Sequence, residues 1–254
     1  MVSAPDLHSG GLQVQVLYRP LTRENMIMPD RENYAADFFS HWSPEMTYVL
    51  GYFCADGCMF VNPRGAKYIA FYSTDRELIV KIRELLGSHN KITVRKRSNP
   101  KWNDLFALQI GSKKIYSDLV SLGLQTNKAR RLSLPDIPDA YVRHFVRGYF
   151  DGDGCISYGY YKRKNRNKTS QSVMVRFASC SKNFLENLSR NVSLVAGIGR
   201  GGISKNSSGY HLVYAKNDSS KLFNFMYNNV SSKQYLKRKH TKFQEAVNAI
   251  GAVA

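Results

Sequence analysis

Acidic residues are scarce in this chain of 254 residues, where 19 aspartates and glutamates stand against 37 lysines and arginines. The formal net charge of +18 at pH 7 repels itself unless a polyanion shares it. Nucleic acid and an anionic membrane surface are the two partners that such a charge favours. With 43% hydrophobic and 12% aromatic residues, the chain should nevertheless fold around a sizeable core.

Long hydrophobic runs are missing as well. No stretch approaches the roughly 18 apolar residues of a membrane-spanning helix, and the N-terminal MVSAPDLHSGG lacks the basic start and apolar run of a secretory signal. The charge therefore favours nucleic acid over a membrane. We expect an intracellular protein that is not secreted, in a bacterial cytoplasm or in an organelle such as a mitochondrion or chloroplast.

Cysteine is rare and scattered, which argues against a disulfide scaffold. Two of the four cysteines are four residues apart, but no second pair or nearby histidine completes a zinc site. We expect reduced or buried thiols at these positions: Cys54, Cys58, Cys155 and Cys180.

An internal repeat organises the chain. YVLGYFCADGC at Tyr48–Cys58 matches FVRGYFDGDGC at Phe145–Cys155. After each copy the residue spacing predicts two strands, a helix, two more strands and a second helix. The expected strands are Cys58–Val61, Lys67–Ser73, Ile92–Arg97, Leu105–Ile110, Cys155–Tyr160, Val173–Ser179, a weaker one near Ile198–Ser204, and Tyr210–Lys216; the expected helices are Asp75–Leu86, Lys113–Leu122, Lys182–Val192 and Ser219–Met226.

The repeat suggests boundaries within the chain. We expect an N-terminal extension at 1–41, a first half at 42–129, a linker at 130–139 and a second half at 140–254, which ends in a basic helix at Ser231–Ile250. Proline residues in the linker stop helices, and Ser43-Pro44-Glu45 has the residues of a helix start.

Small residues four apart mark one face of each motif helix: Gly51 and Ala55, then Gly148 and Gly152. This spacing lets a second backbone approach closely. The two motif helices should therefore pack on each other as the seam between the halves. The aromatic residues of the motifs should point into the two cores: Tyr52, Phe53, Tyr149 and Phe150.

Asp56 and Asp153 should end the motif helices, because glycine follows each of them. The C-terminal end of a helix is the unfavourable end for an acid, and packed helices would also bring the two carboxylates together. A divalent cation relieves both problems, and oxygen ligands suit Mg²⁺. One Asp-Gly after a helix is an ordinary turn, but two in matching contexts favour metal-assisted phosphodiester hydrolysis by water.

The paired motifs VLGYFCADG and VRGYFDGDG resemble the LAGLIDADG homing endonucleases of the monomeric, two-motif type, over about Phe38–Phe243. The resemblance implies an α/β (α+β) fold of pseudo-twofold tandem αββαββα repeats, with two antiparallel sheets forming a saddle over DNA and the motif helices at the central interface. It also implies cleavage of one phosphodiester on each strand of a long DNA target, leaving 3′ overhangs. Mg²⁺ is the expected metal, with Mn²⁺ able to substitute and Ca²⁺ binding without supporting cleavage.

The resemblance also implies roles for individual residues. Asp56 and Asp153 match the acidic metal ligands, and Ala55 and Gly152 complete the expected ligand set. A basic residue of each half should lie near the scissile phosphate or the attacking water; the matching residues are Lys128 and Lys239, with Lys237 as a close competitor. A polar residue at the end of the second strand of each half corresponds to Thr74 and Ser181, for which a helix N-cap is an equally good interpretation.

The motifs depart from the family pattern at two places. Cys54 stands where the family often has an acid, while Asp151 keeps that acid. Arg147 replaces a small residue, and we expect its side chain on an outer face or near DNA.

Basic side chains gather on the expected strands and hairpin loops, where one face of each sheet could read base edges while loops hold phosphates. Arginine suits guanine edges and glutamine suits adenine edges. The candidate DNA-binding residues are Arg64, Lys67, Arg95, Lys96, Arg97, Lys101, Gln109, Lys162, Arg163, Lys164, Arg166, Lys168, Arg176 and Lys205. Because the two halves differ in nearly all of these side chains, the double-stranded DNA target should be asymmetric.

Two other classes compete with a monomeric endonuclease. An intron RNA maturase or a non-cleaving DNA-binding protein could use the same scaffold, although keeping both motif acids disfavours a pure binder. A basic structural protein such as a ribosomal component would not need paired acids at helix ends. The absence of flanking splice residues favours an intron-encoded or free-standing origin over an intein.

Overall fold

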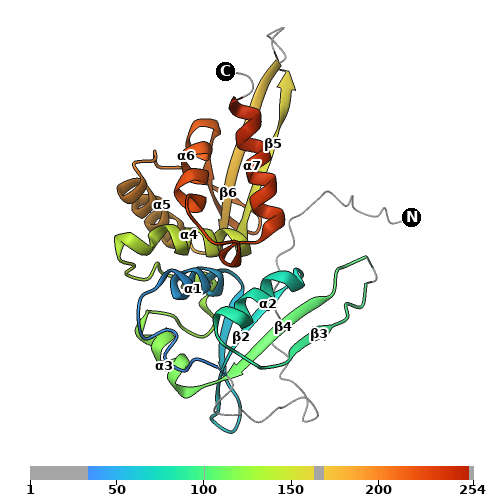
Figure 1. Cartoon of the computed structure of the whole chain (residues 1–254), viewed down its shortest axis with the longest axis vertical. Coiled ribbons are helices and arrows are strands. Elements are labelled where there is room, and N and C mark those ends of the chain that lie inside the picture. The colour runs from blue at the N-terminus through green and yellow to red at the C-terminus, as the bar shows by residue number, and fades with distance from the viewer. Residues whose placement is uncertain (1–33, 100, 163–168, 252–254) are drawn as a thin grey trace, which may run out of the picture.

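The computed structural model describes residues 34–99, 101–162 and 169–251, which form two halves of the same plan (Figure 1). The first half runs α1 (Pro44–Asp56), β1 (Gly57–Val61), β2 (Lys67–Ser73), α2 (Arg76–Leu85), β3 (Ile92–Arg95), β4 (Leu105–Gly111) and α3 (Lys113–Ser121). The second half runs α4 (Asp139–Asp153), β5 (Gly154–Lys162), β6 (Thr169–Ser179), α5 (Lys182–Ala196), β7 (Gly202–Asn206), β8 (Gly209–Tyr214), α6 (Lys216–Tyr227) and α7 (Lys237–Gly251). The predicted tandem αββαββα fold is confirmed.

Each half contains one antiparallel, four-stranded sheet with the same unusual strand order. The first is β1-β2-β4-β3 and the second is β5-β6-β8-β7. Side chains alternate between the two faces of each sheet, so that Ile69 and Phe71 join the main core while Ala70 and Tyr72 lie on the opposite face. Each sheet therefore buries one face against its own helices and presents the other away from them.

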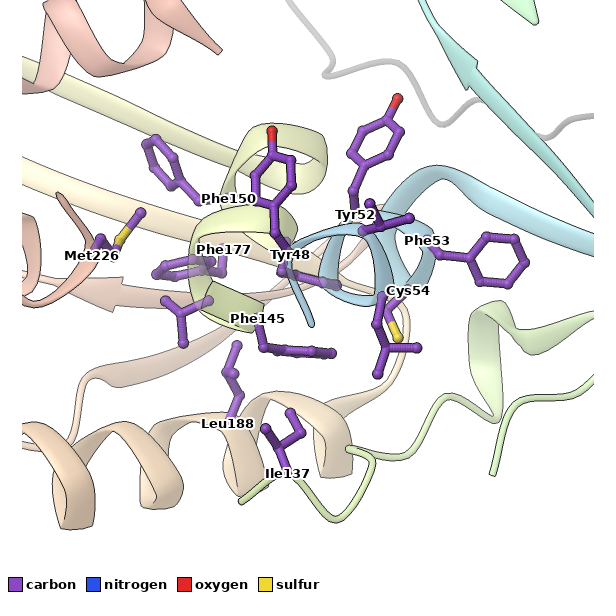
Figure 2. Close-up of a cluster of buried hydrophobic side chains, with 14 of the residues drawn as sticks. Tyr48, Tyr52, Phe53, Cys54, Ile137, Phe145, Phe150, Phe177, Leu188 and Met226 are labelled. Carbon is purple, nitrogen blue, oxygen red and sulfur yellow. The ribbon is translucent and has the colours of Figure 1, made fainter. Parts of the chain in front are cut away.

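The seam between the halves is the pair α1 and α4, which lie side by side between the two sheets (Figure 1). A Cβ atom at Gly51 would overlap the carbonyl oxygen of Phe145, and one at Gly148 would overlap that of Tyr48. The helix backbones thus approach through reciprocal glycines, as predicted. Figure 2 shows Phe53 and Phe150 pointing away from the seam in opposite directions; Phe53 packs on Phe71 of β2 and Phe150 on Phe177 of β6, and one continuous core includes all four.

Local sequence explains how the motif helices start. Ser43 caps α1, because its Oγ accepts a hydrogen bond from the backbone N–H of Met46 at 3.0 Å, and Pro44 occupies the first turn. Pro138 precedes α4 directly. The start of α1 agrees with the sequence-based expectation, whereas α4 already begins at Asp139, the last residue of the expected linker.

Several element boundaries in the second half differ from expectation, and three of the differences have a clear local cause. The third strand is β7 at Gly202–Asn206 rather than near Ile198–Ser204, because it pairs with β8 across a tight turn from Asn206 to Gly209. The fourth strand stops at Tyr214, since the Ala215 carbonyl already accepts from the N–H of Ser219 in α6. The last helix begins only at Lys237, because a short 3-10 turn at Ser232–Gln234 comes first.

None of the helices in the described ranges is long and apolar enough to cross a membrane.

Candidate active site at the helix seam

The two predicted acids end the two motif helices. Asp56 is the last residue of α1 and Asp153 the last of α4, and a strand starts at the glycine that follows each. The Asp56 Oδ2 atom lies only 3.2 Å from the position that a Cβ on Gly152 would occupy. The carboxylate of one half therefore rests against the motif helix of the other.

Small residues make this approach possible. A Cβ on Gly152 would overlap the Cβ of Ala55, and it would crowd Asp56. Both residues were predicted within the metal-ligand set, but neither side chain has a donor atom. Only their carbonyl oxygens could bind a cation.

Burial and mutual repulsion shape the ionisation of the two acids. Burial raises the pKa of Asp56 well above its ordinary range, and the nearby Asp153 carboxylate raises it further. Burial also raises the pKa of Asp153, while Lys128 and Lys239 lower it. Two carboxylates with raised pKa values at helix C-termini favour a cation between or beside them, and the exposure of Asp56 and partial exposure of Asp153 leave that position open to solvent.

The donor set fits a hard divalent cation. Within the described residues, no three histidine, cysteine, aspartate or glutamate side chains come together as a metal cluster. A metal at the seam would therefore be held by the two carboxylates, by carbonyl oxygens of the helix ends and by water. Such an all-oxygen environment suits Mg²⁺ rather than a metal that prefers nitrogen or sulfur.

Each half also brings one lysine to the end of its own motif helix. The Lys128 Nζ atom donates to the carbonyl oxygens of Cys54 at 2.8 Å and Ala55 at 3.3 Å. The Lys239 Nζ atom lies 2.7–2.9 Å from four carbonyl oxygens, those of Phe150, Asp151, Gly152 and Gly154. Burial lowers the pKa of both ammonium groups.

The lysines thus occupy matching places beside the acids, one in each half. A cation at a helix C-terminus offsets the partial negative charge of the free carbonyl groups. Of the two competing lysines on α7, Lys239 reaches the seam, whereas Lys237 is exposed. The structure therefore separates these candidates by position.

The two polar candidates at the strand ends have different surroundings. Ser181 is buried and caps α5, because its Oγ accepts the N–H of Phe184 at 3.2 Å. Thr74 is exposed, and the N-cap of α2 is the next residue, Asp75. The helix-cap interpretation holds for Ser181 and fails for Thr74.

The expectation for Arg147 was wrong. This side chain is neither on an outer face nor near the open sheet surface, but fully buried. Its guanidinium donates to the Met226 carbonyl at 2.7 Å and to the Gln234 carbonyl at 2.6 Å. The chain between α6 and α7 covers this part of α4, which the sequence did not reveal. No sequence signal singled out Gln234.

Three predicted DNA-binding residues lie on the helix-free faces of the sheets. Gln109 of β4 is paired with Ala70 of β2. Arg176 of β6 is paired with Cys155 of β5, two residues after Asp153. The Arg95 guanidinium lies over the Tyr72 ring, 5.7 Å from its centroid.

The other candidates have varied surroundings. Three of them are exposed: Arg64 in a loop, Lys101 in a turn and Lys162 at the end of β5. The Lys96 Nζ atom lies 2.8 Å from an Asp104 carboxylate oxygen, and the Arg97 guanidinium lies 6.0 Å from the centroid of the Trp102 ring.

Two candidates lie on the opposite side from Gln109 and Arg176. Lys67 shares the strand face of Ile69, and its ammonium is 5.0 Å from the ring centroid of Tyr116 in α3. Lys205 shares the strand face of Ile203. Four further candidates lie outside the described residues: Arg163, Lys164, Arg166 and Lys168.

Comparison with known families decides the classification. A family model described as a LAGLIDADG-like domain matches residues 43–121, and one described as a LAGLIDADG endonuclease matches residues 146–250. Together they cover more than half of the chain, with one motif helix wholly or partly in each. The chain belongs to the LAGLIDADG endonuclease family. Asp56 and Asp153 lie within the two matched ranges.

Solved structures share the fold of this LAGLIDADG protein. The meganuclease I-SmaMI bound to cleaved DNA is 15% identical with a TM-score of 0.58, over 84% of this chain and 90% of that one. I-AabMI bound to uncleaved DNA is 14% identical with a TM-score of 0.56, over 83% and 92%. The homing endonuclease I-WcaI bound to its recognition sequence is 14% identical with a TM-score of 0.54, over 80% and 90%. No curated protein sequence matches the chain.

Proposed function

We propose that this LAGLIDADG protein is a Mg²⁺-dependent, site-specific DNA endonuclease that hydrolyses one phosphodiester on each strand of a long asymmetric target and leaves 3′ overhangs. One observation carries the proposal. The Asp56 and Asp153 carboxylates end two reciprocally packed helices, the Asp56 carboxylate rests against the opposite motif helix, and each half supplies a lysine beside them. The family of the chain and the DNA-bound state of its solved relatives support it.

Asp56 and Asp153 would hold the metal, together with the carbonyl oxygens of Ala55 and Gly152. A bound Mg²⁺ would supply Lewis acidity and lower the pKa of bound water. Lys128 and Lys239 would place positive charge beside the two scissile phosphates, where negative charge develops. The close backbone packing of the seam fixes the two acids relative to each other, and contacts with the carbonyl groups of the helix ends hold the two lysines beside them.

The partner is double-stranded DNA, bound along the helix-free faces of the two sheets. These faces carry different side chains at matching register positions, which favours an asymmetric target. The chain acts as a monomer, because its two repeats supply both halves of the site.

A cleavage screen tests the proposal. The protein is incubated with randomised and host-locus DNA libraries in parallel with Mg²⁺, Mn²⁺ and Ca²⁺, and the cut ends are sequenced. We expect one long asymmetric site with 3′ overhangs, cut with Mg²⁺ or Mn²⁺ and bound without cleavage with Ca²⁺. A folded protein that retains DNA or structured intron RNA but cuts no library would contradict the proposal and favour a binding or maturase function.

A further inference from the structure

A buried polar cluster distinguishes α4 from α1. Arg147 and Asp151 occupy the positions at which α1 has Leu50 and Cys54, and all four residues are buried. Burying a charge is costly unless the charge is paired and hydrogen-bonded. Arg147 and Asp151 must therefore make polar contacts in the second half, and these contacts have no equivalent at Leu50 and Cys54 in the first half.

Arg147 fastens both ends of the chain segment between α6 and α7. Its Nη1 donates to the Met226 carbonyl at the end of α6, while Nε donates to the Gln234 carbonyl, just before α7. Its Nη2 donates to the Gln234 side-chain oxygen at 2.7 Å and to His144 Nδ1 at 2.8 Å. His144 must be the acceptor, because guanidinium only donates; burial and the Arg147 charge lower the pKa of this histidine to about 4.

Asp151 also contacts the segment just before α7. Its Oδ2 accepts the N–H of Leu236 at 2.8 Å and the hydroxyl of Tyr48, from α1, at 2.7 Å. The Leu236 carbonyl in turn accepts the N–H groups of Lys239 and His240, both at 3.0 Å. The first turn of α7, which carries Lys239, is thereby tied to α4 through one residue.

Gln234 also reaches the first half. Its Nε2 donates to the Glu45 carboxylate, at the start of α1, at 2.6 Å. We call Arg147, Asp151, Gln234 and Leu236 the α7 clamp. The clamp fixes the start of α7 against α4. The Lys239 side chain extends from this first turn of α7 to the carbonyl oxygens at the end of α4.

We propose that Arg147 and Gln234 are positioning residues, which set Lys239 at the second-half active site through the α7 clamp. The proposal rests on the proposed nuclease function. Lysine has a long, rotamer-rich side chain, so its ammonium is placed well only if its backbone is fixed. Displacements of about 1 Å at a reacting centre can cost on the order of 100-fold in rate. Lys128 has a different support, a 3-10 turn at Lys128–Arg130 after α3.

Strand-resolved cleavage distinguishes positioning from general stability. Lys239→Met first identifies the strand that depends on Lys239. Gln234→Met, which removes both side-chain hydrogen bonds at similar size, should slow that same strand by about tenfold under saturating DNA and leave the other strand within about twofold. The double variant should be no slower than Lys239→Met alone, because positioning acts only through that lysine.

Two further variants serve as a control and as a second, milder perturbation of the α7 clamp. Leu50→Met, at the α1 position that matches Arg147, is a conservative core change and should leave the ratio of the two strand rates unchanged. Tyr48→Phe removes only one hydroxyl from the Asp151 carboxylate, and it should produce a smaller bias toward the same strand even if Gln234→Met folds poorly. Equal slowing of both strands, or additive effects of Gln234→Met and Lys239→Met, would overturn the proposal.

A chemical readout works without cleavage. Reductive methylation followed by mass spectrometry measures how accessible each lysine amine is. Gln234→Met should increase the methylation rate of Lys239 severalfold and leave Lys128 unchanged; an unchanged Lys239 would overturn the proposal. A folded wild-type protein that cuts no DNA would instead contradict the proposed function, and the methylation result would still decide whether the clamp holds Lys239.

Discussion

The two halves of the molecule agree where chemistry is expected and differ where recognition is expected. Each has a motif helix that ends in an acid, and a lysine on the carbonyl groups of that helix end. The helix-free sheet faces differ at matching positions. Ala70 lies between Cys58 and Gln109, whereas its counterpart Arg176 lies between Cys155 and Val213.

The next row of side chains shows the same contrast. Tyr72 and Ala107 pair across the first sheet, and the matching pair in the second sheet is Ala178 and His211. Two phosphodiesters of the same kind require two similar sets of catalytic groups. Under the proposed function, an asymmetric base sequence requires two different reading faces, which agrees with repeats that differ on the sheets and match at the helix-end acids and their lysines.

The largest expected effect tests the symmetry of the seam. Gly148→Ala and Gly51→Ala each place a Cβ on a backbone carbonyl of the facing helix. Because backbone cannot move aside as a side chain can, each should lower the free energy of unfolding by about 3 kcal/mol, the upper end of the usual cost of overpacking. Thermal unfolding measures this, with Gly159→Ala as the control, since a Cβ there meets nothing within 4 Å. If the two seam variants lost very different amounts of unfolding free energy, the two glycines would not be equivalent.

The two lysines provide the next comparison. Lys128→Met and Lys239→Met should each slow one strand by about tenfold to 100-fold through lost charge stabilisation, and the strands should be opposite. Lys239→Met should also lower the melting temperature more, because Lys239 lies against four carbonyl oxygens and Lys128 against two. Strand-specific end-labelling and thermal unfolding measure the two effects. If both variants slowed cleavage of the same strand, the idea that each half supplies one lysine for one strand would be contradicted.

Arg176 tests the asymmetry of the reading faces. Arginine binding two acceptors on guanine contributes about 1–3 kcal/mol of discrimination against the wrong base. Arg176→Ala should therefore relax the preference at one base pair near the centre of the second half-site by roughly tenfold or more. Selection from a partly randomised target measures this, with Val213→Ala in the same row as the control. Relaxation spread evenly over the whole target would indicate a phosphate contact instead.

The smallest expected effect concerns an ion pair between the halves, for which the described residues show no symmetric counterpart. Arg238 at the start of α7 donates to both oxygens of Asp75, at 2.8 and 2.5 Å, and both side chains are partly exposed. Arg238→Ala should cost about 0.2–1 kcal/mol, which added salt would diminish.

The pH dependence of this link has a definite sign. Hydrogen bonding to Arg238 lowers the pKa of Asp75 in the folded protein. The stabilisation is therefore present above the unfolded pKa of about 3.9 and is lost as the pH falls through the lower folded pKa. Thermal unfolding of the wild type and Arg238→Ala should differ at pH 7 and converge in strong acid. A difference that persists in strong acid would show that Arg238 acts by packing.

The repeat made most of the fold and the centre of the site predictable. Paired Gly and Asp-Gly positions constrain backbone geometry locally, so Gly51, Gly148, Asp56 and Asp153 could be placed from spacing alone. Lys67 could also have been placed better, because it shares the alternating pattern of Ile69 and Phe71.

The α7 clamp could not be predicted in the same way. Arginine in a helix usually indicates a solvent-facing or DNA-facing position. Arg147 is buried only because a segment about 80 residues later folds over it, and Gln234 has no local pattern that marks it. Long-range polar contacts of this kind depend on tertiary packing, which residue spacing does not encode.

A double substitution of Asp56 and Asp153 tests whether the two carboxylates are catalytic. Wild type and the Asp56→Asn/Asp153→Asn variant are compared for DNA binding and for cleavage of the selected target with Mg²⁺. We predict that the variant remains folded and binds the target, while cleavage falls by about 1,000-fold or more because the metal ligands are lost. Cleavage near the wild-type rate, or loss of binding together with folding, would contradict a catalytic role for the two acids.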